Sequence, residues 1–417
     1  MQAPGVQATE AAQPRLLHPD VLRGVALLGI ALMNIEYFSR PFETFLMGVP
    51  AGLEGADRVA GLFVHVFVQG KFWTLFSMLF GAGFALMLAS AQAAGRPFTG
   101  FFVARCAALL LIGLAHALLV WEGDILVSYA LAGPALLLFA RGFSNRALLG
   151  VAAALYALPC ALVALGAAAM SLPGAMETVD VDGFLLEVAA AERILAKGTW
   201  LEGLGYRWDS LLRELVHWPL MELPMVLGMF LLGLVLVRTG LLRDPDAHRR
   251  SWRTITLAGL AAGGVLMAAS VAVGTSFPAH PFWPPAAFAL ALALMASPLL
   301  MLGYVGLLLA GLRGAAAPAL AWVAPAGRMP LSNYLAQTLV FSLLFFNHGL
   351  GLWGQVPRAW QLVLALGLFV LQVLLSGLWL RYFRTGPAEW LWRSLAQWRR
   401  LPMRRAPTPG SSPASVQ

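Results

Sequence analysis

The residues best suited to do chemistry lie within or beside long apolar segments. His116 stands in the run Leu-Ile-Gly-Leu-Ala-His-Ala-Leu-Leu-Val, where an uncompensated polar side chain is costly, so we expect it to face the interior of a helical bundle. Glu122 and Asp124 follow within two turns. An imidazole can act as a base or a nucleophile, and a carboxylate can set its tautomer. A structural hydrogen bond is the competing interpretation of His116, and a helix N-cap that of Asp124.

A second group of candidate residues consists of arginines at the predicted cytoplasmic ends of helices. Arg23 and Asn34 are eleven residues apart on one predicted helix, and Arg105 and His116 repeat that spacing on another. The helical rise makes each separation about 16 Å. Arg328 stands in Gly327-Arg-Met-Pro, which predicts a broken helix start. The repeated pattern indicates one shared polar path, whereas the alternative for each arginine is that it reaches the lipid headgroups and serves topology.

The remaining polar residues of the apolar segments have weaker patterns. Lys71 opens a predicted span and is expected either to hold a developing oxyanion, together with Asn34, or to anchor the helix at the interface. Asp20 is expected to line the path or to pair with Arg23 at i+3. A third set shares one predicted span and either lines the path or joins helices at about 1 kcal/mol each: Asn333, Tyr334 and Gln337.

Composition determines which elements position these residues. The chain has 417 residues, of which 59% are hydrophobic and 12% charged, and its mean hydropathy is +0.75. Soluble domains contain about 25% charged residues. We therefore predict an all-α, polytopic transmembrane helical bundle. About ten spans are expected, near 20–37, 71–90, 101–121, 124–140, 147–170, 220–237, 254–273, 285–312, 330–346 and 359–382.

The net charge of +8 reflects arginines that cluster in loops, which is a topology signal and not that of a nucleic-acid-binding protein. Their distribution predicts cytoplasmic N- and C-termini. We expect disordered tails at 1–17 and 401–417, an N-terminal transmembrane half at 18–219 with a long extracytoplasmic loop at 171–219, and a C-terminal half at 220–400. Five spans on each side of that loop would give halves of opposite orientation, as in an inverted repeat.

Five stretches carry a resemblance to a known family. In chain order they are Asp20-Val-Leu-Arg-Gly-Val-Ala-Leu-Leu-Gly-Ile, Lys71-Phe-Trp-Thr-Leu-Phe-Ser-Met-Leu-Phe-Gly-Ala-Gly, Trp121-Glu-Gly-Asp-Ile-Leu-Val-Ser-Tyr, Gly327-Arg-Met-Pro-Leu-Ser-Asn-Tyr-Leu-Ala-Gln and Trp379-Leu-Arg-Tyr-Phe-Arg-Thr-Gly-Pro-Ala-Glu-Trp-Leu-Trp-Arg. Together they resemble the YeiB-like family of bacterial inner-membrane proteins, whose C-terminal half is the domain of unknown function 418. Pro330 and His18 depart from the usual family pattern.

This family is in turn distantly similar to membrane acyltransferases such as heparan-α-glucosaminide N-acetyltransferase. The resemblance implies acyl transfer from cytosolic acyl-CoA, such as acetyl-CoA, to an extracytoplasmic glycan, lipid or small-molecule acceptor. Under that hypothesis Arg23, Arg105 and Arg328 would bind the CoA phosphates. His116 would be the base or nucleophile, supported by Asp124 or Glu122.

A secondary transporter or exporter of a small polar or anionic solute is the alternative, because intramembrane charges and a broken helix are also typical of alternating access. A scaffold or sensor in an envelope complex is a third hypothesis. We expect a multi-pass protein of the bacterial inner membrane, with lipid as its surroundings and no nucleic-acid partner. No metal is expected, because the His and acidic residues lack ligand spacing. The oligomeric state stays open.

Overall fold

The computed structural model describes residues 16–44, 48–217, 219–276 and 282–405. Most of both predicted tails lies outside this part of the chain. The described residues form helices and no strand. The first half contains α1 (Leu17–Asn34), α2 (Gly55–Phe63), α3 (Lys71–Ala93), α4 (Thr99–Leu119), α5 (Leu126–Ala132), α6 (Leu136–Phe139), α7 (Asn145–Met170), α8 (Val181–Lys197) and α9 (Trp200–His217). The second contains α10 (Glu222–Arg238), α11 (Arg249–Val273), α12 (Pro284–Gly311), α13 (Ala317–Trp322), α14 (Ala324–Gly327), α15 (Pro330–Phe345), α16 (Arg358–Tyr382) and α17 (Pro387–Ala396).

The all-α polytopic bundle is confirmed, and the chain is a multi-pass membrane protein. Within the described residues, 7 helical segments are long and apolar enough to cross a bilayer, or up to 8 if the bent pair α9 and α10 is one span. This number is smaller than the predicted ten. The difference arises because three predicted spans correspond to short helices: α10 has 17 residues, α15 has 16, and the apolar segment Leu126–Phe139 is shorter still.

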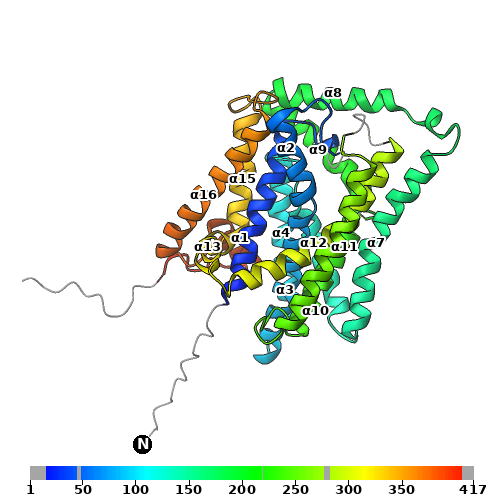
Figure 1. Cartoon of the computed structure of the whole chain (residues 1–417). Coiled ribbons are helices and arrows are strands. Elements are labelled where there is room, and N and C mark those ends of the chain that lie inside the picture. The colour runs from blue at the N-terminus through cyan, green and yellow to red at the C-terminus, as the bar shows by residue number, and fades with distance from the viewer. Residues whose placement is uncertain (1–15, 45–47, 218, 277–281, 406–417) are drawn as a thin grey trace, which may run out of the picture.

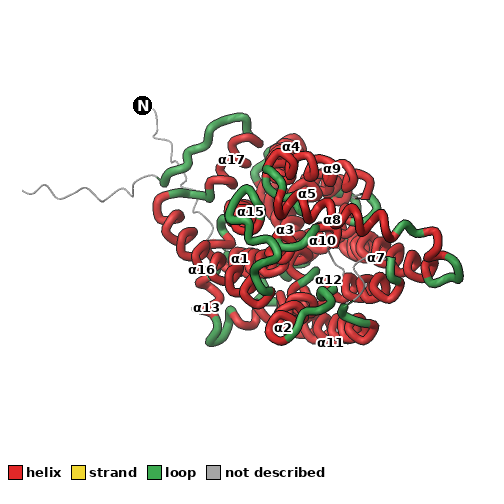
Figure 2. The backbone as a smooth tube through the Cα atoms, turned by 90° about the horizontal axis from the view of Figure 1, so that it is seen from above, coloured by secondary structure: helices red, strands yellow, loops and turns green. Residues whose placement is uncertain are grey.

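α1 is the most deeply buried of the candidate spans among the described residues. In the segment Leu17–Phe38 that contains it, 78% of the most apolar window is buried, against 22% for α11. α1 packs against α3 on one side and against α14, α15 and α16 on another, while α3 packs against α10. Seen from above, α3 and α10 occupy the middle, with α7, α11 and α16 at the periphery (Figure 2). Helices of the two predicted halves are thus interleaved.

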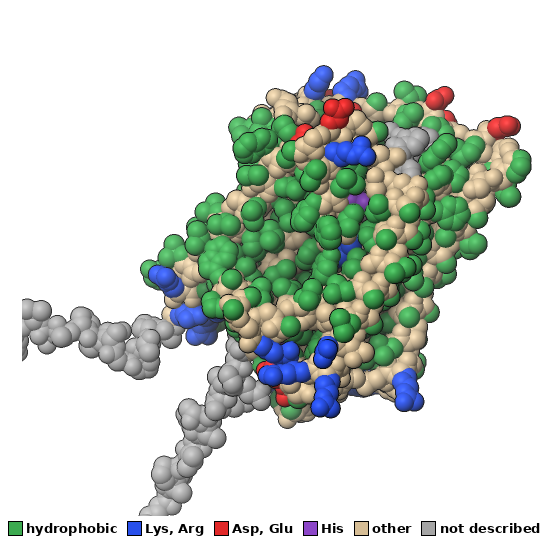
Figure 3. Space-filling view, viewed as in Figure 1, with side chains coloured by type: hydrophobic (Ala, Val, Ile, Leu, Met, Phe, Trp, Pro, Cys, Tyr) green, Lys and Arg blue, Asp and Glu red, His purple; other side chains and the backbone are tan. Residues whose placement is uncertain are grey.

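The two ends of the bundle differ in charge. We call the end where α1 begins the inner end and the opposite end, crossed by α8, the outer end (Figure 1). On the face shown in Figure 3, Lys and Arg side chains gather at the inner end, acidic side chains lie mostly at the outer end, and a hydrophobic band separates them. This distribution agrees with the cytoplasmic N-terminus that the loop charges predict.

α3 begins at Lys71, where the sequence predicts the start of a span. α2 continues into a π-helical turn, Val64–Val68, and Gly70 then takes φ 86°, a left-handed conformation that favours glycine. The chain therefore turns before α3 enters the bundle. Further along α3, a Cβ atom on Gly81 would collide with the backbone carbonyl of Phe230 on α10, so the absence of a side chain permits this close helix crossing.

The predicted broken helix at 327–330 is also present, because α14 ends at Gly327 and α15 begins at Pro330. The backbone N–H groups at the start of α15, which have no partner within the helix, are capped by a residue from far along the chain. Glu389 of α17 accepts hydrogen bonds from the backbone N–H groups of Leu331 and Ser332, at 2.7 and 3.2 Å, and from the hydroxyl of Ser332. A carboxylate at a helix N-terminus is favoured by the helix dipole.

The predicted long outer loop consists mainly of two helices, α8 and α9. α9 covers the outer end of α4, where Nε of Arg207 donates a 2.7 Å hydrogen bond to the carbonyl of Leu118. The hydroxyl of Tyr206 donates to the carboxylate of Glu43, in the connection between α1 and α2, at 3.0 Å. These contacts hold α9 against α4 and against the α1–α2 connection at the outer end of the bundle.

Candidate functional site

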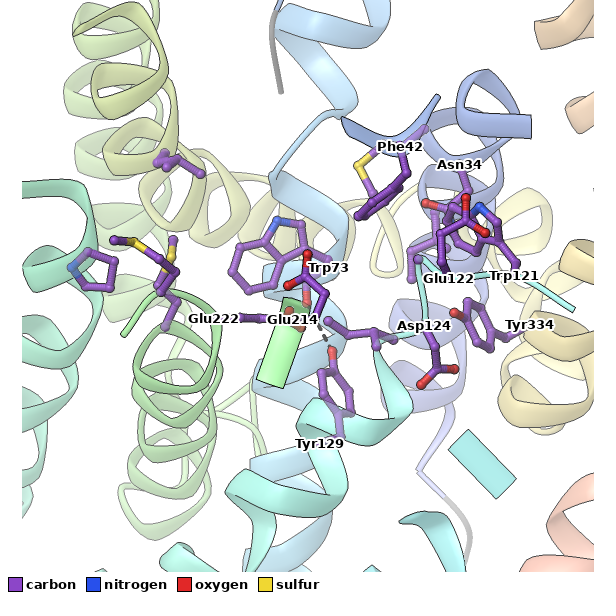
Figure 4. Close-up of a pocket in the computed structure, with 18 of the residues that line it drawn as sticks. Asn34, Phe42, Trp73, Trp121, Glu122, Asp124, Tyr129, Glu214, Glu222 and Tyr334 are labelled. Atoms are coloured by element: carbon purple, nitrogen blue, oxygen red, sulfur yellow. Dashed lines mark hydrogen bonds between the residues drawn. The ribbon is translucent and has the colours of Figure 1, made fainter. Parts of the chain in front are cut away.

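A cavity of about 340 Å³ lies in the outer half of the bundle. Such a volume is near the lower end of the range of small-molecule sites, roughly 300 to 1,000 Å³. Its walls come from α1, α3, α5, α7, α9, α10, α12 and α15 and from the α1–α2 and α4–α5 connections (Figure 4). Five aromatic side chains line it, Phe42, Trp73, Trp121, Tyr129 and Tyr334, and four acidic ones, Glu122, Asp124, Glu214 and Glu222. None of the described residues that line it is Lys, Arg or His.

His116 lies directly behind this wall. It is 4% exposed, and both ring nitrogens have partners: Nδ1 is 2.6 Å from Oδ2 of Asp124, and Nε2 is 2.7 Å from the hydroxyl oxygen of Thr338 on α15. Oδ1 of Asp124 accepts the amide N–H of Val127 at 2.9 Å. Asp124 therefore caps the first turn of α5 and orients His116 at the same time. Asp124, His116 and Thr338 thus form one hydrogen-bonded array, and Asp124 is its member in the cavity lining.

The array can hold a proton without moving its heavy atoms. The hydroxyl of Thr338 can donate to Nε2 of His116, or instead to the carbonyl oxygens of Tyr334 and Leu335, which are 3.3 and 3.1 Å away. The first arrangement fits a neutral His116 with its proton on Nδ1, and the second fits an imidazolium that donates from both nitrogens. Rotation of one hydroxyl thus accommodates both protonation states.

Two polar groups in the cavity wall lack hydrogen-bond partners from other described residues, namely the carboxylate of Glu122 and the indole Nε1 of Trp121. The hydroxyl of Tyr334 donates to no described residue, although the backbone of Ile125 interacts with its oxygen. Glu122, Trp121 and Tyr334 are 9%, 1% and 4% exposed, respectively. Buried polar groups are nearly always satisfied in proteins, and leaving one unsatisfied costs about 1 to 3 kcal/mol. Unsatisfied groups gathered around one cavity indicate a place where a polar ligand binds.

Glu122 lies in the connection after α4, outside the spanning helices. Burial raises its pKa to about 7, and Glu43 nearby acts in the same direction, while Arg207 and Arg213 of α9 act in the opposite direction. The largest of these influences is desolvation of the carboxylate. Glu122 can therefore change its charge near neutral pH.

Two other predicted outer residues lie in different places. Asn34 lines the cavity, as does Glu122. Lys71 is 1% exposed but is not in the lining, and its Nζ donates to the carbonyl of His65 at 3.3 Å. The structure therefore brings Asn34, Glu122, Asp124 and His116 to one wall and leaves Lys71 beside the π-helical turn.

The predicted arginines lie at the inner end, and none of them lines the outer cavity. Arg23 pairs with Asp20 at 3.3 Å, and its side chain is 26% exposed. The guanidinium of Arg105 stacks on the indole of Trp392 in α17, with 3.9 Å between Cζ and the ring centroid. Arg328 lies between α14 and α15, and α14 packs against α1. The arginines thus border the inner ends of α1, α4 and α15.

Polar groups occupy the level between the arginines and the cavity. Nδ2 of Asn333 donates to the hydroxyl of Ser376 at 3.0 Å, and Nε2 of Gln337 donates to Oε1 of Gln372 at 2.8 Å, both on α16. These contacts join α15 to α16. Oε1 of Gln337 is buried without a hydrogen-bond partner, so this level also keeps one unsatisfied acceptor.

Several site residues were not predicted. Trp73, Glu214 and Glu222 line the cavity, and Thr338 completes the array around His116. One signal was present for Thr338, since it follows Tyr334 by four residues and so shares its helical face. The two glutamates come from α9 and α10, whose approach to α4 depends on tertiary contacts.

Comparison with known proteins identifies relatives over nearly the whole chain. A family described as protein of unknown function (DUF418) matches residues 236–399. The chain is 32% identical over 402 residues to uncharacterized protein YxaH of Bacillus subtilis, covering 90% of this chain and 92% of YxaH. It is 31% identical over 391 residues to uncharacterized protein YeiB of Escherichia coli, covering 90% of this chain and 94% of YeiB. No solved structure matches the chain.

Proposed function

From the premise that this chain belongs to the family of YeiB and YxaH, we propose that it is an acyltransferase of the bacterial inner membrane. It moves an acyl group from cytosolic acyl-CoA to an acceptor in the outer cavity. The observation that carries the proposal is the buried array of Asp124, His116 and Thr338 at the cavity wall. A carboxylate and an imidazole joined in this way can take a proton from an acceptor nucleophile.

Acyl-CoA, the donor, would bind at the inner end of the bundle, opposite the outer cavity. CoA is polyanionic, and guanidinium groups bind phosphate through paired hydrogen bonds, so Arg23, Arg105 and Arg328 would hold it at the inner end. The slim pantetheine arm would extend outward between α1, α4 and α15. The unsatisfied Oε1 of Gln337 supports this path, because Gln337 contacts the carbonyl of Leu27, between the levels of Arg23 and Asn34.

In the transfer step, the acceptor nucleophile gives its proton to Asp124 and His116 and attacks the thioester carbonyl. The carbon–sulfur bond breaks, and the CoA thiolate is protonated as it leaves. Tyr334 and Trp121 each have a free buried donor in the cavity wall, and such donors stabilise a developing oxyanion. This assigns them the role that the sequence suggested for Asn34 and Lys71.

Binding of acetyl-CoA to the detergent-purified chain tests the donor site. We expect saturable binding that is about tenfold weaker in Arg23→Ala, because a charge-assisted hydrogen bond to phosphate is lost. Isothermal titration calorimetry measures it. Arg250→Ala is the matched control, since Arg250 is exposed at the inner end of α11. Absence of binding at millimolar acetyl-CoA, or equal weakening by both substitutions, would contradict the proposal.

A secondary transporter is the second candidate, supported by the interrupted helix between α14 and α15 and by the buried polar groups along α15. The two functions differ in their need for a donor. A transporter would move a labelled solute into liposomes without acyl-CoA, whereas a transferase would release free CoA in detergent only when an acceptor is present.

A further inference from the structure

The outer cavity has a composition that selects among acceptors. Its described lining carries four carboxyl groups and no basic side chain. An anionic acceptor would be repelled by this wall, whereas a cation would be attracted to it. The lining therefore favours a cation.

The aromatic side chains of the cavity wall favour a ligand that is both cationic and partly apolar. Trp73, Trp121 and Tyr129 present ring surfaces to the same space as the acids (Figure 4). The faces of aromatic rings attract cations and also bury apolar groups. A ligand with both a positive charge and an apolar body would bind the carboxylates through its charge and pack its apolar part against the rings.

The third observation is independent of the composition. Both carboxylate oxygens of Glu122 are buried without a partner from another residue, although the side chain is in the lining. A carboxylate only accepts hydrogen bonds, so the missing partner is a donor. The indole N–H of Trp121 and the hydroxyl of Tyr334 are donors in the same lining. A ligand that gives a hydrogen-bond donor to Glu122 and an acceptor, such as the carbonyl oxygen of the transferred acyl group, to the other two would satisfy all three groups.

We infer that the acceptor is an organic amine, bound as its ammonium ion between Glu122 and the aromatic wall and acylated on nitrogen. The inference rests on the proposed acyltransferase function for the reaction but not for the binding. The ammonium loses one proton to the array of Asp124 and His116, and the nitrogen then attacks the thioester carbonyl. A carbon–nitrogen bond forms, the carbon–sulfur bond breaks, and the products are an amide and the free CoA thiol.

The binding test compares three ligands of similar shape but different charge: phenethylammonium, phenethyl alcohol and hydrocinnamate. Equilibrium dialysis against the purified full chain, without acyl-CoA, measures their dissociation constants. We expect the ammonium to bind about ten- to a hundredfold more tightly than the alcohol, in line with hydrogen bonds to charged groups, and hydrocinnamate to bind most weakly. Equal affinities, or a preference for hydrocinnamate, would overturn the inference.

Glu122→Gln is the variant that separates charge from shape. It should remove most of the preference for the ammonium over the alcohol while leaving binding of the alcohol unchanged. Glu192→Gln, at an exposed position of α8, is the control and should keep the full preference. If Glu122→Gln retains the preference, the assignment of Glu122 is wrong.

The pH dependence of the unsubstituted chain gives a measurement that needs no variant. Because the pKa of Glu122 is raised to about 7, ionisation as the pH rises through that value should tighten ammonium binding, since the ammonium itself stays charged. The groups that interact with Glu122 are Arg207, Arg213 and Tyr206 of α9 and Glu43 of the α1–α2 connection, and Asp124 lines the same cavity. Affinity that falls between about pH 6 and about pH 8 would contradict this assignment.

Two further measurements identify the source of the amine and test the proposed function apart from the cation site. Competition by phosphatidylethanolamine, but not by phosphatidylglycerol, would identify a lipid headgroup as the amine, and no competition would identify a free amine. Ammonium binding without transfer from acetyl-CoA would keep the cation site and remove the acyltransferase function. Transfer to phenethyl alcohol without ammonium binding would keep the acyltransferase function and remove the cation site.

Discussion

Replacement of His116 by alanine should lower acyl transfer by about 10²- to 10⁴-fold, the usual contribution of acid–base catalysis. The substitution removes the partner of Oδ2 of Asp124 and breaks the link to Thr338. The rate of CoA release from acetyl-CoA, measured with a thiol reagent and a saturating amine, reports the loss. The maximal rate should fall while the KM for acetyl-CoA stays constant, because His116 lies far from the inner arginines.

A structural role for His116 would give a different outcome. His116→Gln keeps a side chain able to hydrogen-bond both Asp124 and Thr338 but cannot take up a proton. If this variant restores thermal stability without restoring transfer, proton handling is the function of the residue. Transfer that persists unchanged in His116→Ala would remove the proposed base.

Gly81→Ala should destabilise the folded chain by about 1 to 3 kcal/mol, as overpacking does. The added methyl group would meet the backbone of Phe230 on α10, and a backbone cannot rotate away as a side chain can. The α3–α10 crossing would therefore have to open. The temperature at which the detergent-purified protein loses its monodisperse elution on gel filtration measures the change.

Gly83→Ala is the matched control on the same helix. A Cβ atom at Gly83 meets no other atom within 4 Å, so alanine should be tolerated there and should add about 0.5 to 1 kcal/mol through its better helix propensity. Similar destabilisation by both substitutions would mean that the close crossing at Gly81 is unimportant.

The sequence was sufficient to predict most of the fold. Membrane-length apolar runs specify helices, because hydrocarbon forces each backbone to satisfy its own hydrogen bonds. Gly70 and Pro330 mark the two interruptions for local steric reasons. The interior position of His116 could also be predicted, since a lone imidazole in an apolar helix is unfavourable when it faces lipid.

The walls of the cavity could not be predicted in this way. Glu214 and Glu222 belong to helices that follow the outer loop, and their distance from Asp124 depends on how α9 and α10 pack against α4 and α3. Lys71 illustrates the opposite failure. It is polar and at the outer level, but the turn at Gly70 directs it toward His65 and away from the lining. Periodicity gives the depth of a residue in the membrane but not its neighbours on other helices.

The small helix α17 joins the two helices that meet at His116. Trp392 stacks on Arg105 and donates to its carbonyl on α4, while Glu389 caps α15. At the outer level the same two helices are joined again by the bond between His116 and Thr338. A movement of α4 past α15 would therefore strain the contacts at both levels. If such a movement accompanies binding at either level, thermodynamic reciprocity requires that the two binding events change each other's affinity by the same factor.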